Sequence, residues 1–315
     1  MASTAGSTAV SSLLGRLQSK GKEQRFSDFC NFVYTSENGK VLGRTGKSWA
    51  QLFLFFIIFY ACLAGFLAAM LTVFFFTLDS TEPRLKGSES FLNLNPGMSF
   101  RPQPDARTTL IRYHRAHRSS FAPLIDNIAA FLQFYENELQ TTETGKLKDC
   151  STVKKFREDA DWDYACRFDI TTELGDICVK QQTFGYADGQ PCVILKLNRI
   201  FDWLPESYTN DTLPQELRDS PGLWQEYFIT VKCEGENPAD RDRLGPILYY
   251  PPHGFHFKYF PFRNQQGYRS PLVFVKFDNP ETAMLFMITC KVYARNIEHD
   301  VVERTGMVHF ELMVD

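Results

Sequence analysis

The stretch that decides the fold is Trp49–Leu78, "WAQLFLFFIIFYACLAGFLAAMLTVFFFTL". It carries no charged residue, and its central part, Phe53–Phe76, is apolar on every helical face. A hydrocarbon layer about 30 Å thick needs roughly 20 such residues. A buried core helix would keep a polar stripe, and a cleaved signal peptide would be shorter and end in a small-residue cleavage motif. The sequence therefore predicts one transmembrane helix over residues 48–78.

The charges on either side of this span predict its orientation. Lys40, Arg44 and Lys47 precede the span, whereas Asp79 and Glu82 follow it and are partly balanced by two basic residues. Because cytosolic flanks carry the basic excess, we expect a cytosolic N-terminal tail over residues 1–47. The part over residues 79–315 should then lie on the exoplasmic side.

The segment "GRTGKSW", Gly43–Trp49, contains a Gly-Lys-Ser triplet that is typical of a phosphate-binding loop. Such a loop needs another glycine at position 41, but Val41 stands there, and no buried strand precedes it. The segment is therefore interpreted as a basic juxtamembrane turn, with Trp49 at the membrane interface.

Small residues recur within the span. Ala61, Gly65 and Ala69 are four residues apart and share one helical face, which would let another helix approach closely. We expect the aromatic residues Phe56, Phe59 and Tyr60 to lie near that face. The alternative is an ordinary lipid-facing composition.

Composition and motifs argue against an enzyme or a nucleic-acid-binding protein. The net charge is −3 and the isoelectric point is near 6.1, and no esterase or metalloprotease motif occurs. The Asp159–Asp161 pair imitates a metal-binding D-x-D motif, but the pattern is very short and no nucleotide-binding α/β region surrounds it, so it is interpreted as a solvated acidic turn. His253 and His256 have ligand-like spacing without any nearby cysteine, so we expect no catalytic residue, cofactor or metal site.

Eight cysteines divide by their expected topology. Cys30 would be cytosolic and Cys62 intramembrane, so neither should form a disulfide. Six exoplasmic cysteines allow fifteen pairings. Sequence neighbours favour the pairs Cys150–Cys166, Cys178–Cys192 and Cys233–Cys290. One sequon, Asn210-Asp211-Thr212, lies in a turn-rich segment and predicts a glycan on Asn210.

The exoplasmic part combines one helical segment with several strands. Residues 92–109 are rich in Pro and Asn and predict an extended stalk, and Ser119–Gln140 has the periodicity of a helix. Five later runs are β-branched and aromatic: "CVILKLNRIFDW", "EYFITVKCEG", "PLVFVKFDN", "AMLFMITCKVYA" and "VHFELMV". The predicted fold is a mainly-β, immunoglobulin-like antiparallel β-sandwich with an added helix, behind a single transmembrane span.

The chain resembles the β subunits of the sodium/potassium-transporting P-type ATPase. The motifs that carry the resemblance are "LGRTGKSW", "FFIIFYACLAG", "FGYADGQPCVILKLNRI", "YYPPHG" and "CKVYARNI". Vertebrate members usually have "YYPYYG" where this chain has "YYPPHG", so an invertebrate-like member is expected. The alternatives are the β subunit of a proton/potassium pump and a cell-adhesion glycoprotein.

The resemblance implies a non-catalytic subunit in the plasma membrane, with its N-terminus in the cytosol. Its partner would be the catalytic α subunit, whose folding and delivery it would assist and whose potassium affinity it would modulate. A small single-span regulatory subunit and membrane lipid would be further partners. The residues expected to contact α are Phe56, Phe59, Tyr60 and Gly65 in the span, and Tyr249 and Tyr250 in the aromatic run "YYPPHGFHFKYFPF".

Overall fold

The computed structural model describes residues 34–35, 40–41, 44–90, 94–136, 140, 147–153 and 164–315. The chain divides into two compact units, Met1–Leu78 and Asp79–Asp315. Each unit is described by itself.

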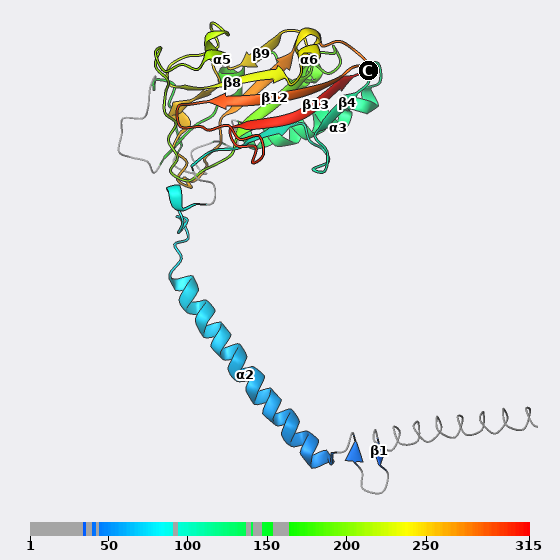
Figure 1. Cartoon of the computed structure of the whole chain (residues 1–315), viewed down its shortest axis with the longest axis vertical. Helices are drawn as coiled ribbons and strands as arrows, with labels where there is room; N and C mark the ends of the chain where they lie inside the picture. Colours follow the sequence, from blue (N-terminus) through cyan, green and yellow to red (C-terminus); the bar gives the residue numbers. More distant parts are fainter. Residues whose placement is uncertain are drawn as a thin grey trace, which may run out of the picture. The chain divides into compact units, whose positions relative to one another are not determined.

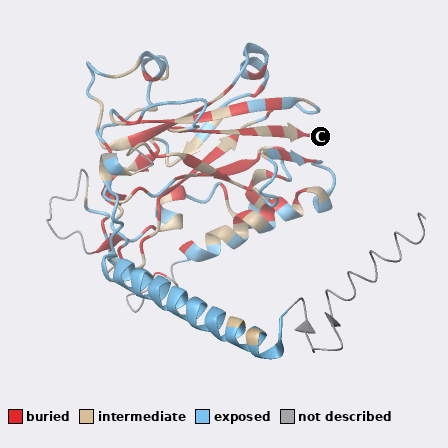
Figure 2. Cartoon of the chain, turned by 60° about the horizontal axis from the view of Figure 1, so that its bottom comes forward, coloured by how far each residue is buried: buried red, intermediate tan, exposed pale blue. Residues whose placement is uncertain are grey.

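The first unit contains the long helix α2, Gly46–Phe76, where a span over residues 48–78 was expected (Figure 1). Its 31 residues correspond to a length of about 46 Å, enough to cross a bilayer with some tilt. None of its side chains is buried, as the pale blue helix in Figure 2 shows. Within the described residues it is the one helix long and apolar enough to span a membrane. The short strands β1, Tyr34–Thr35, and β2, Lys40–Val41, form a two-stranded pair in the same unit.

The second unit is built on two larger sheets (Figure 1). The five-stranded sheet has the order β10-β8-β12-β13-β4, with bounds Phe255–His256, Phe228–Gly235, Leu285–Tyr293, Met307–Val314 and Leu110–Tyr113. The four-stranded sheet has the order β3-β7-β11-β9, with bounds Met98–Arg101, Cys192–Leu197, Leu272–Phe277 and Ile247–Tyr250. A further small pair joins β5, Leu147–Lys148, to β6, Ala165–Cys166.

The core lies between the two larger sheets. The ring of Phe310 on β13 lies 5.0 Å from that of Phe100 on β3 and 6.1 Å from that of Phe277 on β11. β13 alternates buried and half-buried residues, which is the pattern of a strand with one covered face. β7 is buried almost throughout, because its sheet is covered on both faces. The buried residues, red in Figure 2, accordingly gather in the second unit, Asp79–Asp315, which is called the β unit below.

Helix α3, Arg118–Leu132, covers the outer face of the four-stranded sheet. Phe131 of this helix lies against Lys196 of β7 and Arg101 of β3. The apolar face of the helix buries four residues: Phe121, Leu124, Ile125 and Ile128. The segment Lys180–Gly185, a 3₁₀ helix, packs Phe184 on Phe274 of β11. The remaining helices are short: α4, Ile170–Leu174; α5, Gln215–Arg218; and α6, Pro238–Arg243; three further 3₁₀ turns span Gly87–Glu89, Gln133–Tyr135 and Phe257–Tyr259.

The sandwich, its five long strands and its added helix were predicted correctly, with three differences. Residues 92–109 are not wholly a stalk, because Met98–Arg101 pairs with β7 as strand β3. The helix ends at Leu132 rather than Gln140, and a 3₁₀ turn over Gln133–Tyr135 follows it. The sandwich is not entirely antiparallel, because β4 pairs in parallel with β13.

Candidate functional site

The described residues contain no arrangement that suggests catalysis. They hold no group of three or more His, Cys, Asp or Glu side chains that could bind a metal ion. The Asp159–Asp161 pair lies outside the described residues. The His253 ring is bonded to the carbonyl of Leu223 at 3.3 Å, and His256 Nδ1 accepts the amide of Lys258 at 2.9 Å. In both histidines the nitrogen that makes this contact is Nδ1.

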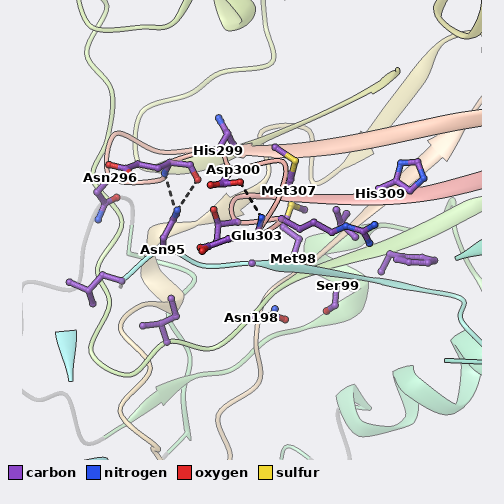
Figure 3. Close-up of a pocket in the computed structure, with 18 of the residues that line it drawn as sticks. Asn95, Met98, Ser99, Asn198, Asn296, His299, Asp300, Glu303, Met307 and His309 are labelled. Carbon is purple, nitrogen blue, oxygen red and sulfur yellow. Dashed lines mark hydrogen bonds between the residues drawn. The ribbon is translucent and has the colours of Figure 1, made fainter. Parts of the chain in front are cut away.

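An open groove of about 1020 Å³ lies beside edge strand β3 (Figure 3). Asp300 and Glu303 from the turn after β12 lie along it, and His309 of β13 lies at one side. The Asp300 carboxylate accepts the backbone amides of Val302 and Glu303, so it stabilises its own turn. His299 contacts the carbonyl of Val292 at 2.8 Å, and burial lowers the pKa of its ring. The groove is thus polar and wide, and its residues His299 and Asp300 make hydrogen bonds within the fold.

Most of the aromatic run that was considered for partner binding belongs to the core. Phe255, Phe257, Tyr259 and Phe260 are all at most 5 % exposed. Tyr249 and Tyr250 on the edge strand β9, and Phe262 at the end of the run, are half-buried and keep an accessible part of their rings. Four of the six rings considered for partner contact therefore fill the core, more than the half that was expected, and the two that remain both lie on β9.

The two tyrosines of β9 point to opposite faces. Tyr249 is opposite Val275 and Tyr250 opposite Phe274, so they alternate across the sheet. The Tyr249 hydroxyl reaches the other sheet and accepts the amide of Cys233 at 2.8 Å. Burial raises the pKa of Tyr249 to about 12, which keeps this hydroxyl protonated. Tyr250 lies instead on the outer face, together with the exposed Leu248.

Strand β9 also offers backbone groups for pairing. It ends the order of its sheet, and the Asp278 amide donates to the Pro246 carbonyl beside it. In an antiparallel ladder that contains this bond, the backbone amides and carbonyls of Leu248 and Tyr250 point toward β11. The backbone amides and carbonyls of Ile247 and Tyr249 then point away from β11. A groove of about 470 Å³ lies along β9, bordered by residues 220–223 and 232–233. This edge, with Leu248 and Tyr250, is a suitable surface for a protein partner.

Helix α2 does not place the four expected contact residues on one face. At about 100° per residue, Phe56, Phe59 and Tyr60 lie roughly 120–180° from Gly65. The expectation that the aromatic residues lie near the Gly65 face is therefore wrong. The rings form a group of their own, since Phe56 and Tyr60 stack at 6.0 Å and Phe59 meets Tyr60 edge-on at 5.4 Å. Around Gly65 an added Cβ would meet no atom within 4 Å, so that face is open.

Three disulfides join the pairs that sequence order favoured: Cys150–Cys166, Cys178–Cys192 and Cys233–Cys290. The third bridge connects directly opposite residues of neighbouring strands β8 and β12, so it joins strands of one sheet and not the two sheets. Cys62 is free, and Cys30 lies outside the described residues. Asn210 is exposed in the turn after Tyr208, where Thr212 Oγ1 accepts the Thr209 amide at 2.9 Å.

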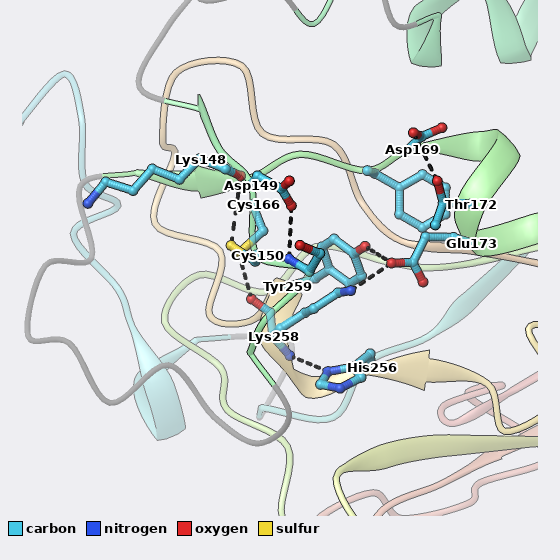
Figure 4. Close-up of polar contacts among 12 residues, drawn as sticks. Lys148, Asp149, Cys150, Cys166, Asp169, Thr172, Glu173, His256, Lys258 and Tyr259 are labelled. Carbon is cyan, nitrogen blue, oxygen red and sulfur yellow. Dashed lines mark hydrogen bonds and ion pairs between the residues drawn. A yellow bond between two sulfur atoms is a disulfide. The ribbon is translucent and has the colours of Figure 1, made fainter.

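A nearly buried ion pair lies beside the disulfide Cys150–Cys166 (Figure 4). No sequence motif predicted this ion pair. Lys258 Nζ lies 2.6 Å from Glu173 Oε1, and the Tyr259 hydroxyl donates to the same oxygen at 2.8 Å. Burial, followed by the charge of Glu173, raises the pKa of Tyr259 strongly. The carbonyl of Lys258 lies 3.3 Å from Cys166 Sγ. The cluster therefore ties α4 and the aromatic run to this disulfide.

These features define a class: a protein with one candidate membrane span and a disulfide-bonded β-sandwich, whose described residues offer surfaces for partners and no catalytic centre. A family model described as "Sodium / potassium ATPase beta chain" matches residues 19–310. The chain therefore belongs to the sodium/potassium ATPase β-chain family.

Individual relatives agree with this assignment. The chain is 35% identical to the probable sodium/potassium-transporting ATPase subunit beta-3 of Caenorhabditis briggsae, over 91% of this chain and 86% of that protein. It is 34% identical to the sodium/potassium-transporting ATPase subunit beta-2 of Drosophila melanogaster, over 90% of each chain. The potassium-transporting ATPase subunit beta of Rattus norvegicus is 28% identical over 94% of this chain and 98% of its own.

Proposed function

We propose that this chain is the non-catalytic β subunit of a sodium/potassium pump and assembles with a catalytic α subunit. The observation that carries the proposal is the family match over residues 19–310, which includes both the span and the sandwich. The aromatic face of α2 and the edge of β9 support it, because both are suitable surfaces for a partner, and the described residues contain no group that could bind a metal ion. In this function the chain assists the folding and plasma-membrane delivery of α and adjusts its potassium affinity.

Within the membrane, the aromatic face of α2 is the proposed contact with α. Phe56, Phe59 and Tyr60 supply large rigid surfaces, and such rings form strong anchors at interfaces. Gly65, on the opposite face, is assigned to a different neighbour: lipid or a small single-span regulatory subunit. That face allows a close approach because no side chain stands between the two backbones.

Outside the membrane, the outer face and free edge of β9 are the proposed contact. Tyr250 and Leu248 supply an aromatic and an aliphatic side chain beside a backbone edge that can accept an extended segment. Tyr249 supports this surface from behind through its bond to Cys233. A contact that differs between the conformations of α would shift its apparent potassium affinity.

The orientation belongs to the same proposal: a cytosolic N-terminus and an exoplasmic sandwich. The basic residues before α2 and the three disulfides after it support this topology. Changing Asn210 to Gln should remove the mass that a glycosidase releases from the wild-type chain. An unchanged glycosidase shift would place the glycan elsewhere, and no shift in the wild type would contradict the exoplasmic position of Asn210.

The direct test is affinity purification of the full chain in mild detergent. A large polypeptide with ATPase activity that needs sodium and potassium together should co-purify. Activity that needs potassium without sodium would indicate a proton/potassium pump, and recovery of the chain with no ATPase would favour an adhesion protein.

A further inference from the structure

The outer face of the five-stranded sheet carries one histidine between two carboxylates. His309 of β13 points outward, since its neighbours Val308 and Phe310 are buried. Its Nδ1 lies 2.7 Å from Glu236 Oε1, and its Nε2 lies 3.0 Å from Glu311 Oε1. Glu236 follows β8, and Glu311 is on the same strand as His309.

Both carboxylates also accept hydroxyl hydrogens. Thr289 Oγ1 on β12 lies 2.6 Å from Glu236 Oε1, and Thr109 Oγ1 before β4 lies 2.7 Å from Glu311 Oε2. The pKa of Glu236 is lowered, chiefly by the hydrogen bond from Thr289 and also by His309. Burial alone would raise the pKa of Glu311, but hydrogen bonds from Thr109 and His309 and the charge of His309 together lower it. Both groups therefore remain ionised down to acidic pH.

This geometry requires two protons on one imidazole ring. A carboxylate accepts and cannot donate, and both threonine hydrogens are already directed at the carboxylates. A neutral ring would donate to one carboxylate while its other lone pair faced an anionic oxygen at hydrogen-bond distance. Only the imidazolium form donates to both glutamates.

We propose that His309 is a proton-operated clamp on the outer face of the sheet. When protonated, it fastens the Glu236 segment after β8 and the Glu311–Thr109 contact beside β4. When it loses a proton, the ring can donate to only one carboxylate at a time, so both contacts are weakened as its two tautomers interconvert. Histidine side chains in general change charge between about pH 5 and 8.

The elements held by the clamp are ones that open easily. β4 is a four-residue edge strand that pairs with β13 alone in the described sheet. Short edge strands have low local stability, so two charge-assisted bonds matter more there than in the core. The clamp also borders a groove of about 440 Å³, so its state changes the shape of this surface.

Other charged groups line the same groove and contribute to the electrostatic potential at His309. Arg241 of α6 is paired with Glu234 at 3.6 Å, and Lys291 of β12 lies 3.9 Å from Glu216. Arg304, from the turn before β13, lines the groove as well. The three cations repel a charged imidazolium, whereas the two glutamates bond it directly, at 2.7 and 3.0 Å.

The test is hydrogen–deuterium exchange of the full chain in detergent micelles at pH 6 and pH 8. Protection is expressed relative to the intrinsic exchange rate at each pH. Peptides covering residues 106–115 and 232–241 should lose about fivefold protection at pH 8, since charge-assisted bonds in partly exposed sites have moderate strength. In H309Q both peptides should show the lower protection at both pH values.

Two further variants complete the design. H309K keeps a positive charge at both pH values and should remove the pH dependence. H117Q changes an exposed histidine whose ring makes no hydrogen bond in the described structure, and it should behave like the wild type. The proposal is overturned if wild-type protection of both peptides agrees within twofold at the two pH values. It is overturned equally if H309Q keeps the wild-type dependence.

Discussion

The phenolic oxygen of Tyr249 lies 2.8 Å from the amide nitrogen of Cys233. The two residues belong to different sheets, β9 and β8, so this bond fastens the edge of one sheet to the other. Cys233 is also bridged to Cys290, which places the bond beside a covalent link within the five-stranded sheet. Tyr249 therefore has a structural role that its neighbour Tyr250 does not share.

Changing Tyr249 to Phe should destabilise the β unit, because the buried amide of Cys233 loses its acceptor. A lost bond of this kind costs about 1–3 kcal/mol, or a fall in Tm of roughly 2–10 °C for a unit of this size. The matched control is Tyr250 to Phe, since no hydrogen bond from its hydroxyl occurs among the described residues, and its Tm should stay within about 1 °C. Thermal unfolding followed by tryptophan fluorescence measures both, and equal Tm values for the two variants would contradict the assigned role.

The long strands and α3 were predictable because their own residues determine them. β7 and β11 are continuous apolar runs, and α3 has a regular apolar stripe. Strand β3 was not predictable in this way, because "MSFR" lies in a segment rich in Pro and Asn and becomes a strand by pairing with β7. Short edge strands depend on their neighbours more than on intrinsic propensity.

The candidate sites show the same division. The cysteine pairs follow from the order of the cysteines along the chain, and the sequon is a local motif, whereas the Lys258–Glu173 pair joins residues 85 apart and has no local signal. The opposite faces of Gly65 and the aromatic group in α2 follow from the helical period alone, so this feature was available in the sequence. For β9, composition indicated that some rings reach the surface, but only the register separates Tyr249 from Tyr250.

The two faces of α2 should respond differently to substitution. Changing Phe56 and Tyr60 together to Ala should reduce the α subunit recovered with this chain several-fold, because it removes two stacked rings from the proposed contact. Changing Gly65 to Leu should leave the recovery within about twofold, because Gly65 lies on the opposite face. Quantitative co-purification, normalised to the amount of this chain in the membrane, measures both. A loss with Gly65→Leu and none with the double variant would assign the contact to the Gly65 face.

Glu173 and Lys258 should show strong energetic coupling. Their side chains are 20% and 10% exposed, so breaking the pair leaves a poorly solvated charge. Glu173→Gln and Lys258→Met should each cost about 2–4 kcal/mol, and the double variant should cost clearly less than the sum of the two. Urea denaturation of the four proteins gives the coupling energy. Additive costs would mean that the two groups act independently, against the 2.6 Å contact.

The β unit should lose stability in acid through His256. Burial, followed by the nearby charge of Lys258, lowers the pKa of His256 to about 4, and its Nδ1 must stay unprotonated to accept the amide of Lys258. An unfolded histidine has a pKa near 6.5, so between about pH 6.5 and 4 the unfolded state binds a proton that the folded state refuses. Stability is therefore full above about pH 6.5 and falls as the pH decreases, by about 1 kcal/mol per unit for a partly exposed ring.

The variant His256→Asn isolates this contribution, because the Asn side-chain oxygen can still accept the amide of Lys258 while it carries no titrating group. Urea denaturation at pH 7.0, 6.0 and 5.0 should show a smaller loss of stability in acid for this variant than for the wild type. The exposed His117→Asn variant is the control and should follow the wild type. His299, whose pKa is also lowered by burial, should leave a residual slope in every protein. If His256→Asn loses as much stability between pH 7.0 and 5.0 as the wild type does, the acid sensitivity lies in other groups.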